Sequence, residues 1–406
     1  MTFLSNAKDA PLDPITGLDQ LFRDDPAAAK INLVVGVWQD EFGVTPVLKA
    51  VKKAEERLLR HEDSKNYIPM AGELGFRTAV HDLVFGADHR LVSSGRVSSL
   101  HTPGGTGALR IAAEFIRDHS PEATLWITSP AYPNHKGIFE AVGLATASYR
   151  YYDVRAGRLL FDELLEDLTQ CRPGDVVVLH GCCHNPTGAD LSDAQWNVLA
   201  KQLAASDVVP FVDLAYLGFS RRLELDSVGA RTVFEACGEG ILTTSFSKNF
   251  GLYSERTGVV SFIAATEAAA SRCAERAKIY SRKIYSSPPS HGSRIVTEVL
   301  TDPDLRAIWV SEVGQMRDRL AEMRQSFAAG LAAHQVDSRV APALTENVGM
   351  FALTLLTPDH VTRLKERHHV YMPPNGRVSI AGMREATMDQ LCEAISDVLK
   401  DLPLPG

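Results

Sequence analysis

The chain has 406 residues, of which 45% are hydrophobic and 23% are charged, and its formal net charge at pH 7 is −8. This length is more than one simple hydrophobic core usually supports, so we expect two domains. Acidic and basic residues are intermixed, which argues against a nucleic-acid-binding surface, and no apolar run is long enough to cross a bilayer.

The first residues, MTFLSNAKDAPLDP, lack the apolar stretch of a secretory signal. The six cysteines are scattered, and Cys182 and Cys183 are adjacent, which is typical of buried thiols rather than of a disulfide framework. No Cys or His residues show zinc-site spacing, so we expect no metal. These features predict a soluble, cytoplasmic protein with no membrane or nucleic-acid partner.

The middle of the chain alternates short apolar runs with amphipathic helical patterns such as residues 191–206. This alternation predicts an α/β fold with a mostly parallel sheet covered by helices on both faces. In such sheets, ligands bind beyond the carboxyl ends of the strands, so functional residues should follow the apolar runs. The runs are residues 124–128, 175–181, 207–216, 240–246 and 257–264.

The last hundred residues differ in pattern. A long helical pattern begins near Asp304, short strand patterns follow at 349–356 and 376–383, and a final helix is expected over 388–400. We therefore predict an N-terminal segment that packs with a small C-terminal α+β domain, and a large domain between them. The expected boundaries are 1–45, 46–310 and 311–406.

The segment TPGGTGALR (102–110) places Gly105 and Thr106 at the start of an apparent helix. Backbone N–H groups at a helix N-terminus bind phosphate, and the threonine hydroxyl adds a donor. Taken alone, the same residues also fit a tight turn capped by threonine.

Two further segments follow apolar runs. In HGCCHNPTG (180–188), the proline after Asn185 favours an extended backbone that presents the amide to a cleft, although Asn-Pro is also a turn signal. In FVDLAYLGF (211–219), Asp213 ends a strand and Tyr216 follows. A carboxylate there needs a cation or donor, such as a protonated ring nitrogen, unless it caps the next helix.

The segment SFSKNFGLYSER (245–256) places Lys248 between two serines and Arg256. Two hydroxyls and a guanidinium suit a phosphate, and a desolvated lysine beside them can react as a free amine. Together, these segments offer a phosphate site, an acid for a ring nitrogen, a donor for a ring hydroxyl and an amine for an aldehyde. Pyridoxal 5′-phosphate requires all four.

The sequence closely resembles the class I aminotransferases of fold type I, in particular the aspartate and aromatic amino acid aminotransferase subgroup. The similarity extends over nearly the whole chain, which makes a chance motif match very unlikely. It includes NLVVGVWQDEFGVTPVLKAVKKAE, KNY, TPGGTGALR, PNHK, HGCCHNPTGAD, DLAYLGF, SFSKNFGLYSERTG, YSSPPSHG, LRAIW and GRVSIAGM.

The resemblance implies a role for each matching residue. Lys248 would carry the cofactor and shuttle a proton, Asp213 would pair with the ring nitrogen, and His180 would orient Asp213. Asn185 and Tyr216 would contact the ring hydroxyl, and Tyr132 would stack on the ring. The phosphate contacts would be Gly105, Thr106, Ser245, Ser247, Arg256 and, from the neighbouring subunit of a homodimer, Tyr67.

The resemblance also implies substrate contacts. Arg377 would clamp the α-carboxylate together with Asn185, and Gly36 would lie on a mobile segment that closes over the substrate. Arg282 would cross from the partner subunit to bind a side-chain carboxylate, although it could instead be a solvated charge at a helix end.

This chain departs from the subgroup pattern at the substrate end. Tyr132 stands where tryptophan is usual, Ser287 stands where many members have asparagine, and Lys283 adds a cation beside Arg282. These changes predict a roomier and more polar distal pocket. Aspartate, glutamate, an aromatic amino acid, or a sulfonate or phosphonate analogue of aspartate would all be candidate substrates.

The predicted activity is transfer of an amino group from an L-amino acid to 2-oxoglutarate by a ping-pong mechanism. A lyase or β-decarboxylase would use the same cofactor, but Arg377 together with Arg282 favours a two-carboxylate substrate and transamination. A regulator that uses this fold would need an added DNA-binding domain, for which the chain has neither the length nor the basic surface.

Overall fold

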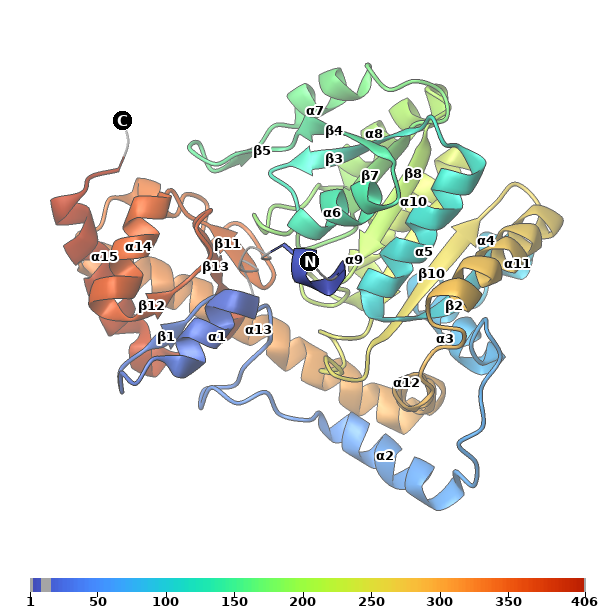
Figure 1. Ribbon diagram of the computed structural model, residues 1–406, viewed down its shortest axis with the longest axis horizontal. Coiled ribbons are helices and arrows are strands. Elements are labelled where there is room, and N and C mark those ends of the chain that lie inside the picture. The colour runs from blue at the N-terminus through green and yellow to red at the C-terminus, as the bar shows by residue number, and fades with distance from the viewer. Residues whose placement is uncertain (1–2, 9–15, 405–406) are drawn as a thin grey trace.

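The computed structural model describes residues 3–8 and 16–404. Its centre is a seven-stranded sheet in the order β2-β10-β9-β8-β7-β3-β4 (Figure 1). Only β10 runs antiparallel to its neighbours, so the predicted mostly parallel sheet is confirmed. The strands are β2 (Val97–Pro103), β3 (Thr124–Ser129), β4 (Ala145–Arg150), β7 (Val176–His180), β8 (Val209–Leu214), β9 (Gly240–Ser245) and β10 (Thr257–Ile263).

The inner strands are apolar throughout because both faces of the sheet are covered. Along β7, Val176 and Val178 pack into one hydrophobic cluster, whereas Val177 and Leu179 pack into another on the opposite face. Successive side chains of a strand point to opposite faces, so both sets must be apolar. The first cluster includes residues of α5, and the second includes residues of α8 and α10.

The helices follow the strands in sequence, as the alternating pattern predicted. Ser192 and Gln195 form a capping box that fixes the start of α8. The helices are α1 (Thr16–Asp24), α2 (Lys49–His61), α3 (Leu74–Val84), α4 (Arg90–Ser93), α5 (Gly104–His119), α6 (Pro133–Ala141), α7 (Phe161–Leu168), α8 (Asp193–Ala205), α9 (Leu223–Asp226), α10 (Val228–Cys237), α11 (Glu267–Ile284), α12 (His291–Thr301), α13 (Pro303–Ala333), α14 (Pro358–His368) and α15 (Met388–Asp401), with short 3-10 turns η1 (Phe3–Asn6), η2 (Ser338–Val340), η3 (Ile380–Gly382) and η4 (Glu385–Thr387).

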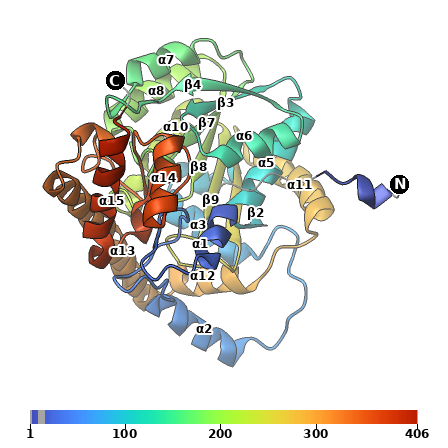
Figure 2. The ribbon, with the colours of Figure 1, turned by 60° about the vertical axis from the view of Figure 1, so that its left-hand side comes forward.

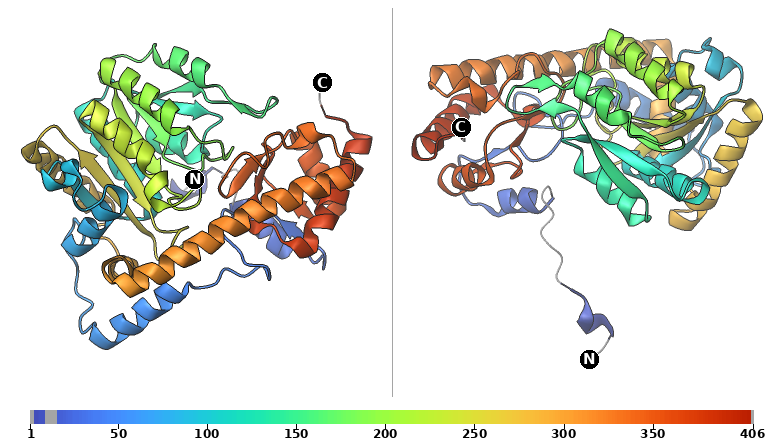
Figure 3. Two further views of the ribbon diagram at one scale, coloured as in Figure 1. Left: turned by 180° about the vertical axis from the view of Figure 1, so that it is seen from behind. Right: turned by 90° about the horizontal axis from the view of Figure 1, so that it is seen from above.

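The C-terminal part is built on two short strand pairs and joined to the sheet by one long helix. Helix α13 runs from beside α2 and α12 to α15 (Figure 3). The expected boundary at residue 310 therefore lies inside a continuous helix, and the three-part division remains a proposal. Strand β11 (Phe351–Leu353) pairs with β13 (Arg377–Ser379), β1 (Ile31–Asn32) pairs with β12 (Val370–Tyr371), and β5 (Tyr152–Asp153) pairs with β6 (Arg158–Leu159).

All six cysteines fall within the described ranges and are free thiols. The turn η1 lies away from the body of the molecule, whereas α1 packs beside the C-terminal elements (Figure 2). Across residues 3–8 and 16–404, no helix combines the length and apolar character needed to cross a membrane.

Candidate active site

A cavity of about 170 Å³ lies where the carboxyl ends of β7, β8 and β9 face the N-terminus of α5. This is the sheet edge at which parallel α/β folds bind ligands. Eleven of the residues selected from the sequence line it, namely Gly105, Thr106, Tyr132, His180, Asn185, Asp213, Tyr216, Ser245, Ser247, Lys248 and Arg256.

One end of the cavity is an anion site. Helix α5 begins at Gly104, whose φ of 71° suits glycine, and a Cβ there would lie 2.7 Å from Nη2 of Arg256. A Cβ on Gly105 would lie 3.3 Å from Cβ of Ser245, and Arg256 Nη1 donates to Ser247 Oγ at 3.5 Å. The unpaired N–H groups of the first helical turn, two serine hydroxyls and a guanidinium therefore converge on one point, as phosphate binding requires.

Lys248 lies beside this anion site, in the turn after β9. Its side chain is half-buried, and Nζ lies 5.0 Å from the centroid of the Tyr216 ring. Burial lowers the pKa of Lys248, the nearby Arg256 lowers it further, and Asp213 partly opposes both effects. The lysine therefore has a larger fraction of free amine than an exposed lysine, which is the form that attacks an aldehyde.

Asp213 is buried at the end of β8 and is held from two sides. Its Oδ2 lies 3.0 Å from His135 Nε2, and its Oδ1 accepts a hydrogen bond from Thr243 Oγ1 at 3.0 Å. Burial alone raises the pKa of Asp213, but its contacts with neighbouring side chains, above all the hydrogen bond from His135, outweigh burial, so the pKa falls below its usual value. Asp213 is therefore ionised at neutral pH, and a carboxylate in this position suits a protonated ring nitrogen.

The group that orients Asp213 differs from the sequence-based expectation. We expected His180 in this role, but the hydrogen bond comes from His135, and the His180 ring lies 5.0 Å from the His135 ring. Burial lowers the pKa of His180 well below its usual value, so its ring is neutral at neutral pH, and its Nε2 has no hydrogen-bond partner among the described residues. His135 and Thr243 were both missed, although the PNHK segment quoted for the resemblance contains His135.

Asn185 and Tyr216 form a polar pair on the cavity wall. Asn185 Nδ2 donates to Tyr216 Oη at 3.3 Å, and Asn185 Oδ1 has no partner among the described residues. Burial raises the pKa of the Tyr216 phenol, so the phenol stays neutral and can donate a hydrogen bond. Tyr132 also lines the cavity, with the edge of its ring against His135 at a centroid distance of 5.3 Å.

Arg377 and Gly36 both lie against the ring of Phe351, and neither residue lines the cavity. The Arg377 guanidinium lies 4.3 Å from the ring centroid, donates from Nη2 to Val34 O at 2.7 Å, and has no carboxylate partner in the described part of the chain. Burial lowers its pKa. A Cβ on Gly36 would lie 2.5 Å from Cζ of Phe351, so a glycine lets the N-terminal segment pass over this ring.

Besides Arg377 and Gly36, three further selected residues, Tyr67, Arg282 and Ser287, do not line the cavity. Tyr67 is 93% exposed, between α2 and α3. Arg282 is exposed in the last turn of α11, where Nη1 donates to Ser286 Oγ at 2.6 Å, and Ser287 follows that turn. Ser286 has a positive φ of 68°, so the chain turns sharply immediately after α11.

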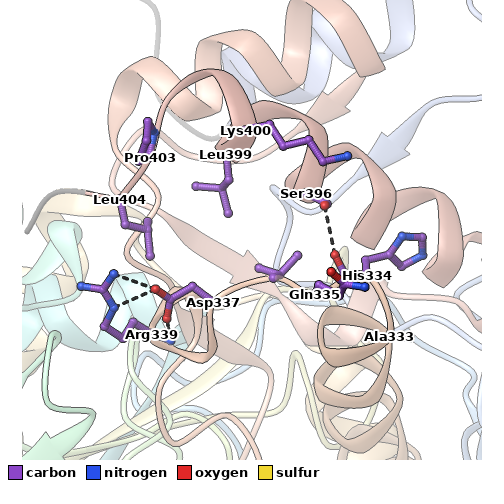
Figure 4. A pocket seen from close by; sticks show the side chains of 11 residues that line it. Ala333, His334, Gln335, Asp337, Arg339, Ser396, Leu399, Lys400, Pro403 and Leu404 are labelled. Atoms are coloured by element: carbon purple, nitrogen blue, oxygen red, sulfur yellow. Dashed lines mark hydrogen bonds and ion pairs between the residues drawn. The ribbon is translucent and has the colours of Figure 1, made fainter.

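A larger pocket of about 510 Å³ lies where the end of α13 faces α15 (Figure 4). Arg339 is paired there with Asp337, and Ser396 Oγ donates to the carbonyl of His334 at 3.1 Å. None of the residues selected from the sequence lines this pocket. Its size alone does not make it an active site, because it does not lie at the carboxyl ends of the parallel strands.

The cavity at the sheet edge fits pyridoxal 5′-phosphate. The anion site suits the phosphate, Lys248 suits the aldehyde, and Asp213 suits the ring nitrogen. The unpaired Asn185 Oδ1 and His180 Nε2 are buried polar atoms of the kind that a bound molecule satisfies.

Comparison with known proteins identifies the family. Residues 28–395 match the family model for aminotransferase class I and II. The aspartate aminotransferase of Salmonella typhi is 44% identical over 97% of this chain and 99% of its own length. The aromatic-amino-acid aminotransferase of Burkholderia pseudomallei, solved covalently bound to pyridoxal phosphate, is 38% identical, with a TM-score of 0.93 over 98% of this chain and 100% of that chain. An aromatic amino acid aminotransferase of Psychrobacter sp. B6, crystallised with aspartic acid, is 38% identical, with a TM-score of 0.94 over the same shares of the two chains.

The match covers nearly the full length of both partners in each comparison, and the cavity carries the groups that the cofactor needs. The chain therefore belongs to the class I and II aminotransferases and is a pyridoxal-phosphate-dependent aminotransferase of fold type I.

Proposed function

We propose that this aminotransferase works as a homodimer and moves the amino group of an acidic or aromatic L-amino acid to 2-oxoglutarate by ping-pong kinetics. The observation that carries the proposal is the position of Lys248. Its half-buried amine, with a lowered pKa, lies between the anion site and the ionised Asp213.

Each residue of the cavity has a chemical task in this proposal. The bound cofactor supplies an aldehyde and an electron-withdrawing ring. Gly105, Thr106, Ser245, Ser247 and Arg256 would hold its phosphate. Asp213, held by His135, would keep the ring nitrogen protonated, and Asn185 and Tyr216 would hold the ring hydroxyl.

Lys248 then acts as the general base and acid. Its Nζ removes the proton from Cα of the substrate and later returns it, so one residue serves both halves of the transfer. The lowered pKa supports this role, because a lysine that is mostly protonated cannot accept a proton. Arg377 binds the substrate α-carboxylate, since it is a buried guanidinium with no carboxylate of its own.

In this proposal, the substrate side chain is contacted by residues that a second copy of the chain supplies. Arg282 and Tyr67 are exposed in the single chain, which is how residues that complete a neighbouring site would appear. We propose that Arg282, with Lys283 and Ser287 beside it, meets the side-chain carboxylate of an acidic substrate. Tyr67 would contact the partner's cofactor phosphate.

Both acidic and aromatic donors belong to the proposal. The similar proteins are named for aspartate and for aromatic amino acids, and one aromatic enzyme was crystallised with aspartic acid. Lys283, a second cation next to Arg282, supports an acidic analogue such as a sulfonate or phosphonate as an additional substrate. A cytoplasmic location, suggested by the six free thiols, is also part of the proposal.

The test is a half-reaction screen. The absorbance of the bound cofactor is followed as the holoenzyme is mixed with aspartate, glutamate, phenylalanine, tyrosine, cysteate or phosphonoalanine. We expect at least one acidic or aromatic donor to convert the cofactor fully, and 2-oxoglutarate to reverse the change. Release of an amino acid fragment or CO₂ without consumption of 2-oxoglutarate would instead indicate a lyase or decarboxylase.

A further inference from the structure

Asn185 and Tyr216 meet on the cavity wall although they come from two different loops. Asn185 lies in the loop after β7, and Tyr216 lies in the loop after β8. Asn185 Nδ2 donates to Tyr216 Oη at 3.3 Å, which is long for a hydrogen bond. A long contact weakens further when the loops that carry its two side chains move apart. The groups that hold the two loops together therefore control this polar pair.

Each of the two loops is fastened by its own carboxylate. In the loop after β7, Asp190 Oδ1 accepts a hydrogen bond at 3.1 Å from the backbone N–H of His184, the residue before Asn185. In the loop after β8, the backbone N–H of Gly218 donates to Oδ2 of the buried Asp226 at 2.8 Å. Both loops are thus fixed by a carboxylate within two residues of the side chain that lines the cavity.

Ser220 connects the two carboxylates. Its hydroxyl donates to Asp190 Oδ2 at 2.7 Å, and its backbone N–H donates to Asp226 Oδ2 at 3.1 Å. Among the described residues, Ser220 is the one that is hydrogen-bonded to both carboxylates. The loop after β8 is therefore tied to the loop after β7 through this hydroxyl.

The two carboxylates need such donors to stay close together. Burial raises the pKa of Asp226 to about 6, and the charge of Asp190 adds to the rise. Burial also raises the pKa of Asp190, whereas hydrogen bonds from its neighbours, including the Ser220 hydroxyl, oppose the rise. Like charges repel, and donors between them favour the ionised forms. Ser220 supplies one donor to each carboxylate and so stabilises the contact between the loops.

We propose that Ser220 is a positioning residue, whose hydroxyl joins the two loops and so sets the spacing of Asn185 and Tyr216 at the ring hydroxyl of the cofactor. The inference rests on the proposed function, because it takes this polar pair as the contact of the ring hydroxyl. Ser220 does not line the cavity, so it acts only through the two loops.

The first test is the pH dependence of the absorbance of the bound cofactor, which needs no turnover. Hydrogen bonds donated to the ring hydroxyl oxygen favour the deprotonated cofactor, so weaker bonds raise the pH at the midpoint of the absorbance change. We expect Ser220→Ala to raise this midpoint by about 0.3 to 1 pH unit, as for one weakened hydrogen bond.

The conservative variant Ser220→Thr should restore the wild-type midpoint, because it keeps the hydroxyl. Ser220 lines a pocket of about 690 Å³, which has room for the added methyl group. The matched control is Ser206→Ala, since Ser206 is a half-buried serine whose hydroxyl donates to the carbonyl of Gln202 in α8. The control should leave the midpoint unchanged. An equal rise in Ser206→Ala, or no rescue by threonine, would overturn the proposal.

The sign of the shift separates positioning from charge. Removing the hydroxyl takes a donor from Asp190 and so favours protonation of that carboxyl. Loss of this negative charge would lower the midpoint, which is opposite to the direction that we expect. A lowered or unchanged midpoint in Ser220→Ala would therefore contradict the positioning role.

The second test asks whether the effect passes through the polar pair. We expect Tyr216→Phe alone to raise the midpoint by about 1 pH unit, because one hydrogen bond to the ring hydroxyl is lost. In that background Ser220→Ala should add little, since the phenol whose position it sets is gone. Full additivity of the two shifts would show that Ser220 acts elsewhere, and the proposal would fail.

The third test needs no cofactor. Hydrogen–deuterium exchange of the cofactor-free, full-length chain is followed by mass spectrometry. We expect the peptides that contain His184 and Gly218 to exchange about 3- to 10-fold faster in Ser220→Ala than in Ser206→Ala, because the link between the loops is lost. Equal exchange in the two variants would contradict the link.

Failure of this inference can be told apart from failure of the proposed function. Because Ser220 does not line the cavity, its variants should retain the cofactor, which the absorbance verifies. If no donor drives the half-reaction in the wild-type enzyme, the proposed function fails, whatever the midpoints show. If the half-reaction proceeds but Ser220→Ala leaves the midpoint unchanged, only the positioning role fails.

Discussion

The cofactor cavity and the distal group, defined as Tyr67, Arg282, Lys283 and Ser287, differ in how far one chain completes them. The cavity is lined mostly by buried or half-buried side chains, and within one chain Asp213 is hydrogen-bonded to His135 and Arg256 to Ser247. The distal group lies on loops and on the end of α11, mostly exposed. Under the proposed function, reaction type is determined within one subunit, whereas choice of substrate depends on a second copy.

Removing the amine of Lys248 is the strongest test of the cavity side of this comparison. We expect Lys248→Ala to lower kcat by about 10⁴-fold or more, because the proton at the substrate Cα loses its base and acid. The cofactor should remain bound through its phosphate contacts. Stopped-flow absorbance measures the half-reaction, and phosphate analysis after dialysis measures retention. The exposed Lys201→Ala is the control, and near-normal turnover of Lys248→Ala would contradict the mechanism.

Changing Arg377 should affect every substrate, because the α-carboxylate is common to all. We expect Arg377→Lys to lower kcat/KM by about 10- to 100-fold for acidic and aromatic donors alike, since lysine cannot make the two-pronged contact. Steady-state kinetics with aspartate and phenylalanine measure this effect. The surface variant Arg339→Ala, which breaks only an exposed ion pair, is the control. If kcat/KM fell for only one class of amino donor, Arg377 would not be the binding site of the α-carboxylate.

Many of the cavity residues were predictable because they lie at or after strands that sequence alone identifies. Asp213 lies near the end of one apolar run and Lys248 just after another, and parallel strands bring their carboxyl ends to one edge. His135 and Thr243 were missed because they contact Asp213 only through tertiary structure. Thr243 is the neighbour of Asp213 across the β8–β9 register, and no local pattern encodes that pairing.

The same limit explains two strands that periodicity did not predict. Strand β2 reads VSSLHTP and β4 reads ATASYR, so neither is an apolar run. Ser99 of β2 donates a hydrogen bond to Ser261, whereas both ring nitrogens of the buried His101 lack a partner among the described residues. Strand β4 lies at an edge with much of its length exposed. The composition of a segment does not show whether its polar groups will be buried with hydrogen-bond partners.

Arg282 tests the distal side and should produce a smaller, selective effect. We expect Arg282→Ala to lower kcat/KM for aspartate by about 10-fold and to leave phenylalanine nearly unchanged, because only the acidic side chain needs the guanidinium. Arg272→Ala, which removes an exposed arginine from the same helix, is the matched control. Mixing Arg282→Ala with Lys248→Ala subunits should restore part of the aspartate activity if Arg282 crosses to the partner's site. No restoration, despite formation of mixed dimers, would contradict the shared site.

The last prediction concerns the pKa of Lys248. The variants should change the pH at which Lys248 becomes reactive rather than its maximum reactivity. In the cofactor-free enzyme, Arg256 lowers this pKa and Asp213 raises it. Arg256→Gln should therefore move the pH dependence of Lys248 reactivity toward an amine-directed reagent to higher pH, because the ammonium form is no longer repelled. Asp213→Asn should move it to lower pH, because the ammonium form loses its counter-charge. Mass spectrometry of the labelled peptide measures both profiles. Shifts in the same direction would show that burial, rather than these two charges, controls the amine, whereas opposite shifts would place control of Lys248 within the cavity of a single subunit.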